Sequence, residues 1–218
     1  MAEANTINDY IDIIRCCTKE GLGGCRENAR YYYRGEPEDY GDTAGQPGIA
    51  RGEWLKGNRE SDLFYECERR LPEEFARCRS TFEKLVVMQH YGIPTRLVDI
   101  SLDPLTALFF ALYLDPLRHG PRDKDAAVLV YEIPMQDICM YTSDKVSVVA
   151  NIAAYRYDDL AIAPLSGNVD SFNANDSIHH LLHQIRAEKP HFRDEIIKDH
   201  LSGVYCVHPR LDNPRIKA

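Results

Sequence analysis

The sequence has no apolar segment long enough to cross a membrane as a helix. Such a helix needs about 20 consecutive apolar residues, and the longest apolar run, over 105–114, is interrupted by Thr106 and Tyr113. The first ten residues, MAEANTINDY, lack the basic stretch and apolar core of a signal peptide. We therefore expect a cytoplasmic protein that does not contact a membrane.

Cysteine occurs in no pattern that indicates disulfides or zinc. The chain has seven cysteines, an odd number, and no Cys-x-x-Cys pair, which favours a reducing compartment without a disulfide framework. Cys16, Cys17 and Cys25 lack the usual spacing of zinc ligands. His179 and His183 lie four residues apart, but no glutamate completes an HExxH pattern. We expect no metal site and predict that these histidines face solvent.

An excess of positive charge is also missing. The formal net charge is −8, and the acidic residues are spread along the chain. This distribution argues against a broad phosphate-binding surface, although it allows a local basic pocket for a dinucleotide or a nucleic-acid end. Otherwise the composition, 44% hydrophobic and 28% charged, is that of a globular protein. A chain of 218 residues can form one full core or two small ones.

The densest group of special residues lies between Gln89 and Ala111. A helix with one apolar face is predicted to run from Pro72 to Gln89, and Gly92 is predicted to end it in the left-handed conformation of a C-cap. The following residues, 95–99, are predicted to form a short strand.

A second helix is predicted over 105–114, with Asp103 as its N-cap and Pro104 at its first position. Because this helix is apolar nearly all round, we expect it to be buried.

Polar residues are concentrated on the short connections between these two helices. Binding and catalytic side chains often occur where a rigid scaffold presents short connections. The alternative is that Arg96 and Asp99 only satisfy each other and nearby carbonyl groups. The polar set consists of Gln89, His90, Thr95, Arg96, Asp99 and Asp103.

An aromatic-rich strand is predicted over 30–35. Alternation places Tyr31 and Tyr33 on one side and Tyr32 and Arg34 on the other. An arginine at the end of a strand, followed by Gly35, can direct its guanidinium at a phosphate or ribose. The alternative is a structural arginine bonded to loop carbonyl groups.

The remaining elements complete an α+β pattern. Thr6 and Asp9 form a variant capping box at the start of the first helix. The expected elements are helices over 6–16, 61–69 and 176–188, strands over 126–133 and 203–208, and a strand or helix over 146–152.

The run HYGIPTRLVDISLDPLTALFFA, residues 90–111, resembles the core motif of FRG domains. In that motif His-x-Gly-x-Pro-Thr-Arg-Leu-Leu-Asp precedes a polar turn, a proline and an alanine-rich helix. The family also has an upstream Phe/Tyr-Arg-Gly, which Tyr33-Arg34-Gly35 matches here. Two separate motifs in the right order carry the resemblance.

The resemblance implies an α+β fold of the ADP-ribosyltransferase type, with a mixed or antiparallel central sheet flanked by helices. It implies NAD or a related nucleotide as substrate, a protein or nucleic acid as acceptor, and a role in bacterial or phage conflict or as a toxin. The implied catalytic residues are Arg34, His90, Arg96 and Asp99, and the implied cofactor-binding residues are Tyr33, Arg34, Gly35, Thr95, Arg96 and Phe110.

The same resemblance leads us to expect a single FRG domain over 1–218 with its C-terminal end missing. FRG domains continue into a Gln-x-Gly-x-Phe segment that this sequence does not contain. A non-catalytic module that binds a nucleotide, nucleic acid or protein is therefore the alternative function. A hydrolase with Asp99 and Asp103 as its carboxylate pair is a weaker one, because Asp103 is expected to cap a helix.

Overall fold

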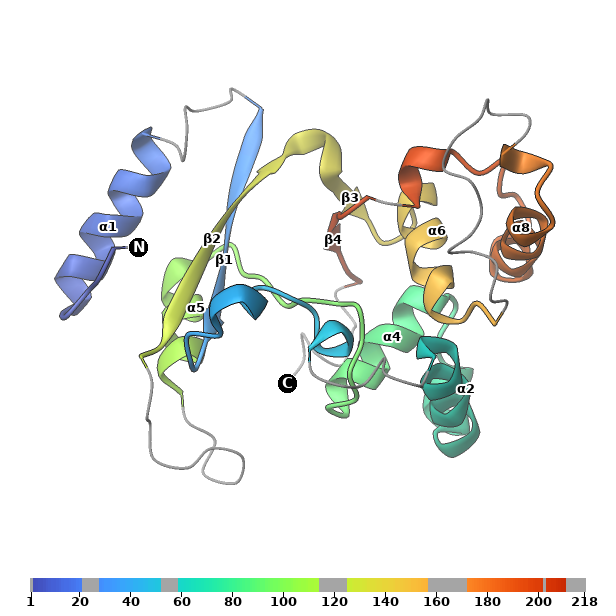
Figure 1. Cartoon of the computed structure of the whole chain (residues 1–218), viewed down its shortest axis with the longest axis horizontal. Coiled ribbons are helices and arrows are strands. Elements are labelled where there is room, and N and C mark those ends of the chain that lie inside the picture. The colour runs from blue at the N-terminus through green and yellow to red at the C-terminus, as the bar shows by residue number, and fades with distance from the viewer. Residues whose placement is uncertain are drawn as a thin grey trace. The chain divides into compact units, whose positions relative to one another are not determined.

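The computed structural model describes residues 2–20, 28–51, 59–113, 125–156, 172–201 and 203–210 (Figure 1). The chain divides into two compact units. The first unit comprises Met1–Gln46 and Val98–Asp137, and the second comprises Pro47–Leu97 and Ile138–Ala218. Within the described ranges, no helix is long and apolar enough to cross a membrane.

The first unit is built around one antiparallel strand pair. Its elements are α1 (Ile7–Glu20), β1 (Ala29–Glu36), α5 (Pro104–Leu112) and β2 (Ala127–Pro134). In the β1–β2 register, Tyr32 lies opposite Tyr131 and Arg34 opposite Leu129. One face of the pair packs with α1 and α5 around Tyr10, Ile14, Tyr33 and Ala107.

The helix α1 begins with the predicted capping box. Asp9 N–H donates to Thr6 Oγ1 at 3.1 Å, and Thr6 N–H donates to the Asp9 carboxylate at 2.9 Å. Tyr10 and Ile14 are buried as expected from the helical period, whereas Ile7 is 63% exposed.

The alternation predicted for β1 is confirmed. Tyr31 and Tyr33 pack into the cluster shared with α1 and α5. Gly35 faces the same way and brings the strand against α5: a Cβ at this position would lie 1.9 Å from the carbonyl oxygen of Ala107. Only glycine allows this approach of strand and helix backbones.

The prediction that α5 is buried all round is wrong. Its buried face consists of the small residues Ala107 and Ala111. Phe109 and Phe110 are 58% and 57% exposed. The close contact with β1 at Gly35 explains the choice of alanine on the inner face, and it leaves the large side chains on the outer one.

The second unit is mainly helical. Its elements are α2 (Glu60–Arg70), α3 (Pro72–Ala76), α4 (Thr81–His90), α6 (Asp144–Ala153) and α8 (Asp176–Glu188), with the strands β3 (Ile138–Met140) and β4 (Cys206–His208). β3 and β4 pair in parallel. Short 3₁₀ helices occur in both units, at Gly41–Thr43, Gly48–Ala50, Met135–Asp137 and Lys198–His200.

Two apolar clusters form the core of the second unit. One includes Phe64, Leu85 and Met88, and the other includes Val148, Ile178 and Ile185. The helix predicted over 176–188 is confirmed as α8, which has Asn175 as its N-cap and buries Ile178, Leu181 and Ile185. The ambiguous segment over 146–152 is helical, within α6.

The helix predicted from Pro72 to Gln89 is interrupted. It ends as α3 at Ala76, and α4 begins anew with Ser80 as N-cap, whose hydroxyl accepts from Glu83 N–H at 3.3 Å. The predicted end is correct: Gly92 has a φ of 74°. Its N–H bonds to the Gln89 carbonyl at 3.0 Å, and Ile93 N–H bonds to that of Met88 at 3.0 Å, which is the Schellman pattern of a helix C-terminus.

The mixed α+β class is confirmed, but the predicted single central sheet is not observed. The described residues form two separate two-stranded sheets, and the strand predicted over 126–133 pairs with β1 alone. The predicted strand over 95–99 is irregular backbone; extended pairing is limited to a bridge between Tyr33 and Ser101.

Candidate functional site

Arg34, near the end of β1, has a guanidinium held on two sides. Its Nε donates to Glu36 Oε1 at 2.9 Å, and its Nη1 donates to the backbone carbonyl of Asp99 at 3.1 Å. Its side chain is 21% exposed. Among the described residues no acceptor meets the remaining nitrogen, Nη2. Arg34 is therefore fixed in orientation and retains donors for a ligand.

Glu36, two residues along the same strand, is completely buried. Besides Arg34, its carboxylate accepts from the backbone N–H of Gly45 at 3.3 Å. Gly45 has a φ of 72°, and a Cβ there would lie 2.7 Å from the hydroxyl oxygen of Tyr131. The positive φ therefore favours glycine at this position, and an added Cβ would also displace the Tyr131 hydroxyl. Because a buried carboxylate must be paired, Glu36 and its partners fix the position of Arg34.

Tyr33 supplies the link between β1 and the loop that carries Asp99. Its backbone N–H and carbonyl both bond to Ser101, each at 2.7 Å. This bridge holds the Asp99 carbonyl beside Arg34. The Tyr33 ring is buried among core residues, and burial raises the pKa of its phenol. Tyr33 therefore acts in this arrangement through packing and backbone geometry.

Phe110, predicted as a cofactor-binding residue, lies on the outer face of α5 and is exposed. The inner face of α5 packs against the side of β1 that carries Gly35, and Arg34 points to the opposite side of the strand by alternation. The structure does not bring Phe110 and Arg34 together.

Arg96, in the second unit, has every side-chain nitrogen engaged. Its Nε and Nη2 donate to the two carboxylate oxygens of Glu60, the first at 3.1 Å, and its Nη1 donates to the carbonyl of Val149 at 3.2 Å. The expected partner Asp99 is thus replaced by Glu60 at the start of α2. This bidentate pair joins a loop to two helices, which is a structural role.

Thr95 and His90 differ in their surroundings. Thr95 is buried, with its hydroxyl accepting from Leu97 N–H at 3.2 Å. His90 is exposed at the end of α4, where its ring contacts that of Tyr91 edge to face at 5.4 Å. Neither residue shows a geometry that assigns it a chemical step.

Asp103 is the N-cap of α5, as predicted. Its carboxylate accepts from Leu105 N–H at 3.1 Å and from Thr106 N–H at 3.0 Å. The Thr106 hydroxyl donates to it at 2.7 Å, and this bond is the main cause that lowers the pKa of Asp103. A carboxylate engaged in this way is poorly suited to general-acid catalysis.

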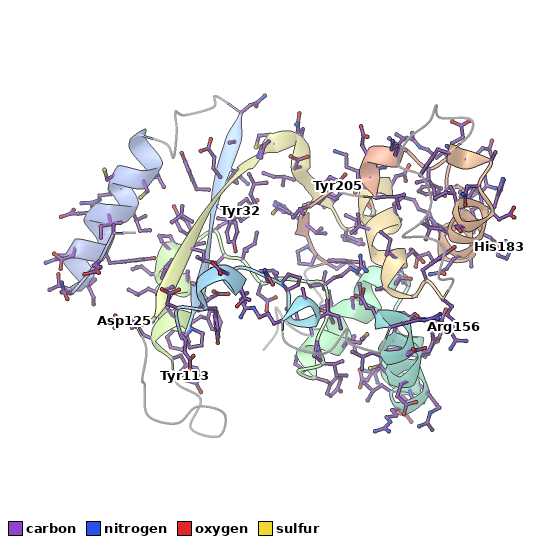
Figure 2. The ribbon with its side chains drawn as sticks, viewed as in Figure 1. Tyr32, Tyr113, Asp125, Arg156, His183 and Tyr205 are labelled. Carbon is purple, nitrogen blue, oxygen red and sulfur yellow. The ribbon has the colours of Figure 1, made fainter. Side chains whose placement is uncertain are left out.

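The histidines of α8 are exposed, as predicted (His183 is labelled in Figure 2). Across the described ranges, no group of three histidine, cysteine or acidic residues is arranged to hold a metal ion. Cys25 lies outside those ranges, as do the C-terminal residues 211–218.

The sequence-predicted site residues divide between the two units. Tyr33, Arg34, Gly35 and Asp99 come together in the first, whereas His90, Thr95 and Arg96 belong to the second. Sequence reasoning missed Glu36 and Glu60, the partners of the two arginines. Glu36 had a local signal, since it directly follows Arg34-Gly35, but Glu60 lies 36 residues from Arg96 and had none.

Comparison with known proteins gives one result. The family model described as FRG domain matches residues 29–117. No curated protein and no solved structure matches the chain.

Proposed function

With residues 29–117 belonging to the FRG domain family, we propose that the chain binds NAD through Arg34 and is an NAD-dependent ADP-ribosyltransferase-like domain. The NAD substrate and the transferase-like fold rest on the family resemblance. A role in a conflict or toxin system, and an acceptor that is a protein or nucleic acid, belong to the same proposal.

The observation that carries the binding proposal is the orientation of the Arg34 guanidinium. Two of its nitrogens are occupied by Glu36 and the Asp99 carbonyl, and the third presents two N–H groups. A guanidinium held by other groups loses little conformational entropy when it binds a ligand. It is therefore suited to an oxygen of the NAD pyrophosphate or of a ribose.

The pairing with Glu36 also defines the kind of contact. Glu36 neutralises most of the charge of Arg34, so the attraction for an anion at long range is weak. The contact instead depends on direction, through hydrogen bonds at short range. The exposed carboxylate of Asp99 belongs to the same arrangement, and carboxylates accept hydrogen bonds from ribose hydroxyl groups in dinucleotide sites.

The proposed reaction needs little acid–base chemistry. Nicotinamide leaves with the electron pair of its bond to the ribose, and a nucleophile of the acceptor forms the new bond at the same carbon and releases its proton. The protein must hold the dinucleotide in place while positive charge develops on the ribose. Asp99 is placed by this proposal near that charge. The roles of His90, Thr95, Arg96 and Phe110 remain predictions from the resemblance.

The proposal is tested by titrating NAD into the full chain in a calorimeter and following nicotinamide release by chromatography. We expect binding that Arg34→Lys weakens at least about tenfold, because a lysine lacks the planar fork that donates to Glu36 and ligand together. Arg15→Lys is the matched control, since Arg15 is a surface arginine of the same unit with a 67% exposed side chain. Absence of NAD binding by the wild-type chain would overturn the proposal.

A non-catalytic binding module is the second candidate, and one observation favours it. Arg96, the arginine of the longer motif, is fully engaged by Glu60 and Val149. If Arg96 has only a structural role, a domain that binds its ligand through Arg34 alone is suited to recognition without turnover. NAD binding without nicotinamide release in the presence of candidate acceptors would favour this function.

A further inference from the structure

The outer side of α5 carries large exposed apolar side chains. Leu105, Phe109 and Leu112 recur at helical spacing and share one side of the helix, Phe110 lies beside that side, and Leu102 and Tyr113 flank the helix at its two ends. The exposed fractions of the large side chains are 55% for Leu102, 51% for Leu105, 58% for Phe109, 57% for Phe110, 56% for Leu112 and 51% for Tyr113. We call these six residues the α5 face.

The centre of the α5 face is an aromatic cluster. The ring of Phe109 stacks on that of Tyr113, with centroids 5.4 Å apart, and meets that of Phe110 edge to face at 5.6 Å. Tyr113 lies at the end of the helix (Figure 2). Rigid aromatic groups of this kind form the energetic centres of protein interfaces.

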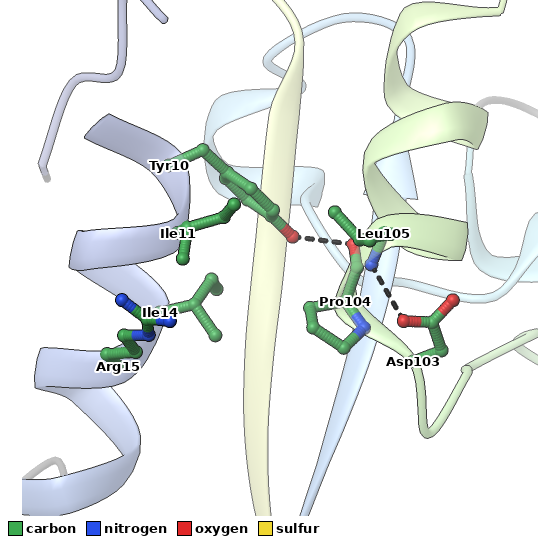
Figure 3. Close-up of a pocket in the computed structure, with 7 residues that line it drawn as sticks. All are labelled: Tyr10, Ile11, Ile14, Arg15, Asp103, Pro104 and Leu105. Carbon is green, nitrogen blue, oxygen red and sulfur yellow. Dashed lines mark hydrogen bonds between the residues drawn. The ribbon is translucent and has the colours of Figure 1, made fainter. Parts of the chain in front are cut away.

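An apolar groove adjoins the α5 face. It has a volume of about 300 Å³ and lies between α1 and the start of α5 (Figure 3). The hydroxyl of Tyr10 is already bonded to the carbonyl of Pro104 at 2.7 Å, so the walls offer apolar surface. Leu105 belongs both to the groove and to the α5 face. The protruding aromatic cluster and the groove therefore lie next to each other on one surface.

The area of the α5 face matches what a second copy requires. With roughly 100 Å² contributed by each half-exposed side chain, it presents roughly 600 Å², at the upper limit for the largest apolar patch of a monomer. Two copies would bury roughly 1,200 Å², the lower limit for a specific interface. The groove adds to this area.

Charge also favours an identical partner at this surface. The chain carries a net charge of −8, so two copies repel each other over most of their surfaces. The helix from Pro104 to Leu112 contains no charged residue. The charged residues that line the groove, Arg15 and Asp103, have opposite signs.

We propose that the α5 face and its groove join two copies of the chain in a symmetric dimer, in which the aromatic cluster of each copy packs against the α5 face and groove of the other. A two-fold axis makes the same patch serve both partners, so protrusion and hollow are used twice. This inference concerns a surface apart from Arg34 and does not depend on the proposed function.

Sedimentation velocity on the full chain, from about 1 to 100 µM, tests the proposal in the range expected of a small interface. We expect a concentration-dependent dimer. Phe109→Asp should raise the dissociation constant at least about 30-fold, because it places a charge at the centre of the interface. Ile11→Asp, which alters the groove from α1, should also weaken the dimer.

Val204→Asp is the matched control, because Val204 is 91% exposed, lies in the second unit and should leave dimerisation unchanged. Circular dichroism verifies that each variant folds. The proposal is overturned if the wild-type chain is monomeric throughout the range. It is equally overturned if Phe109→Asp dimerises as well as wild type, or if the α5 face proves to bind a different macromolecule as a monomer.

Discussion

Arg34 and Arg96 have the same kinds of hydrogen-bond partner but differ in how many of their guanidinium nitrogens those partners occupy. Each arginine donates to a glutamate and to a backbone carbonyl. All three side-chain nitrogens of Arg96 donate to protein acceptors, whereas Nη2 of Arg34 has no acceptor in the described part of the chain. The two side chains are equally buried, each 21% exposed. They nevertheless differ in the number of hydrogen-bond donors that they can offer to a ligand.

This difference shows that an arginine in a sequence motif can bind a ligand only if the folded protein leaves some of its N–H donors unpaired. Both arginines stand in the motifs that identify the family, and the sequence treats them alike. The structure separates them because the Glu60 carboxylate takes two nitrogens of Arg96, while the Glu36 carboxylate takes one of Arg34 and one backbone N–H from Gly45. The following predictions test this contrast, beginning with the largest expected effect.

Gly35→Ala should remove the framework on which the Arg34 site depends. The new Cβ would lie 1.9 Å from the Ala107 carbonyl oxygen, so β1 and α5 must separate. We expect the free energy of unfolding to fall by at least about 3 kcal/mol, measured by urea denaturation. Gly48→Ala is the control, with its nearest neighbour 3.6 Å away. An equal effect of the two substitutions would contradict the close approach of β1 and α5.

Arg96→Ala should destabilise the second unit. It removes the two guanidinium hydrogen bonds to the Glu60 carboxylate, which is 14% exposed, and leaves that carboxylate without its counter-charge. We expect a loss of about 2–4 kcal/mol in the free energy of unfolding. Arg69→Ala is the control, because its side chain is 69% exposed and its surface ion pair is screened by solvent and contributes little to stability. A negligible effect of Arg96→Ala would show that Arg96 is not structural.

The conservative pair Arg34→Lys and Arg96→Lys should separate binding from stability. We expect Arg34→Lys to weaken NAD binding at least about tenfold while the chain remains folded, because the positive charge beside Glu36 remains but the planar fork is lost. Arg96→Lys should lower the thermal midpoint of unfolding and leave NAD affinity unchanged. Loss of NAD binding in both variants, with both folded, would break the contrast between the two arginines.

The smallest effect expected is a pH dependence at His200 in the second unit. Burial and the positive charges of Lys145 and Arg193 lower the pKa of His200 below its ordinary value of 6.5, against the opposing effect of Asp144 and Asp199. The folded state therefore binds fewer protons than the unfolded state, and the unfolded state gains from protonation.

The free energy of unfolding should accordingly fall as the pH decreases below about 6.5 and through the folded-state pKa. His200→Gln should reduce this slope, as measured by urea denaturation at several pH values between about 5 and 7.5. His180→Gln is the control at an exposed histidine. An unchanged slope in His200→Gln would exclude this histidine as the source.

Local signals predicted much of the fold. The capping box of α1, the alternation in β1, Asp103 as N-cap and the end of α4 at Gly92 all follow from contacts between residues at most a few positions apart. The interruption between α3 and α4 was missed, although Ser80 and Glu83 carried a local capping signal. The strand predicted over 95–99 failed because a pattern of five residues does not specify a pairing partner.

For the candidate site, the sequence by itself determined which residues stand together in the FRG motifs and therefore that Arg34 and Arg96 are candidates. Only the tertiary structure decided that Glu60 and Val149 engage Arg96 completely, and that the large side chains of α5 face outward. The physical reason is distance along the chain: capping and alternation depend on neighbouring residues. The pairing of an arginine, or the choice between an alanine face and an aromatic face, depends on residues that folding alone brings into contact.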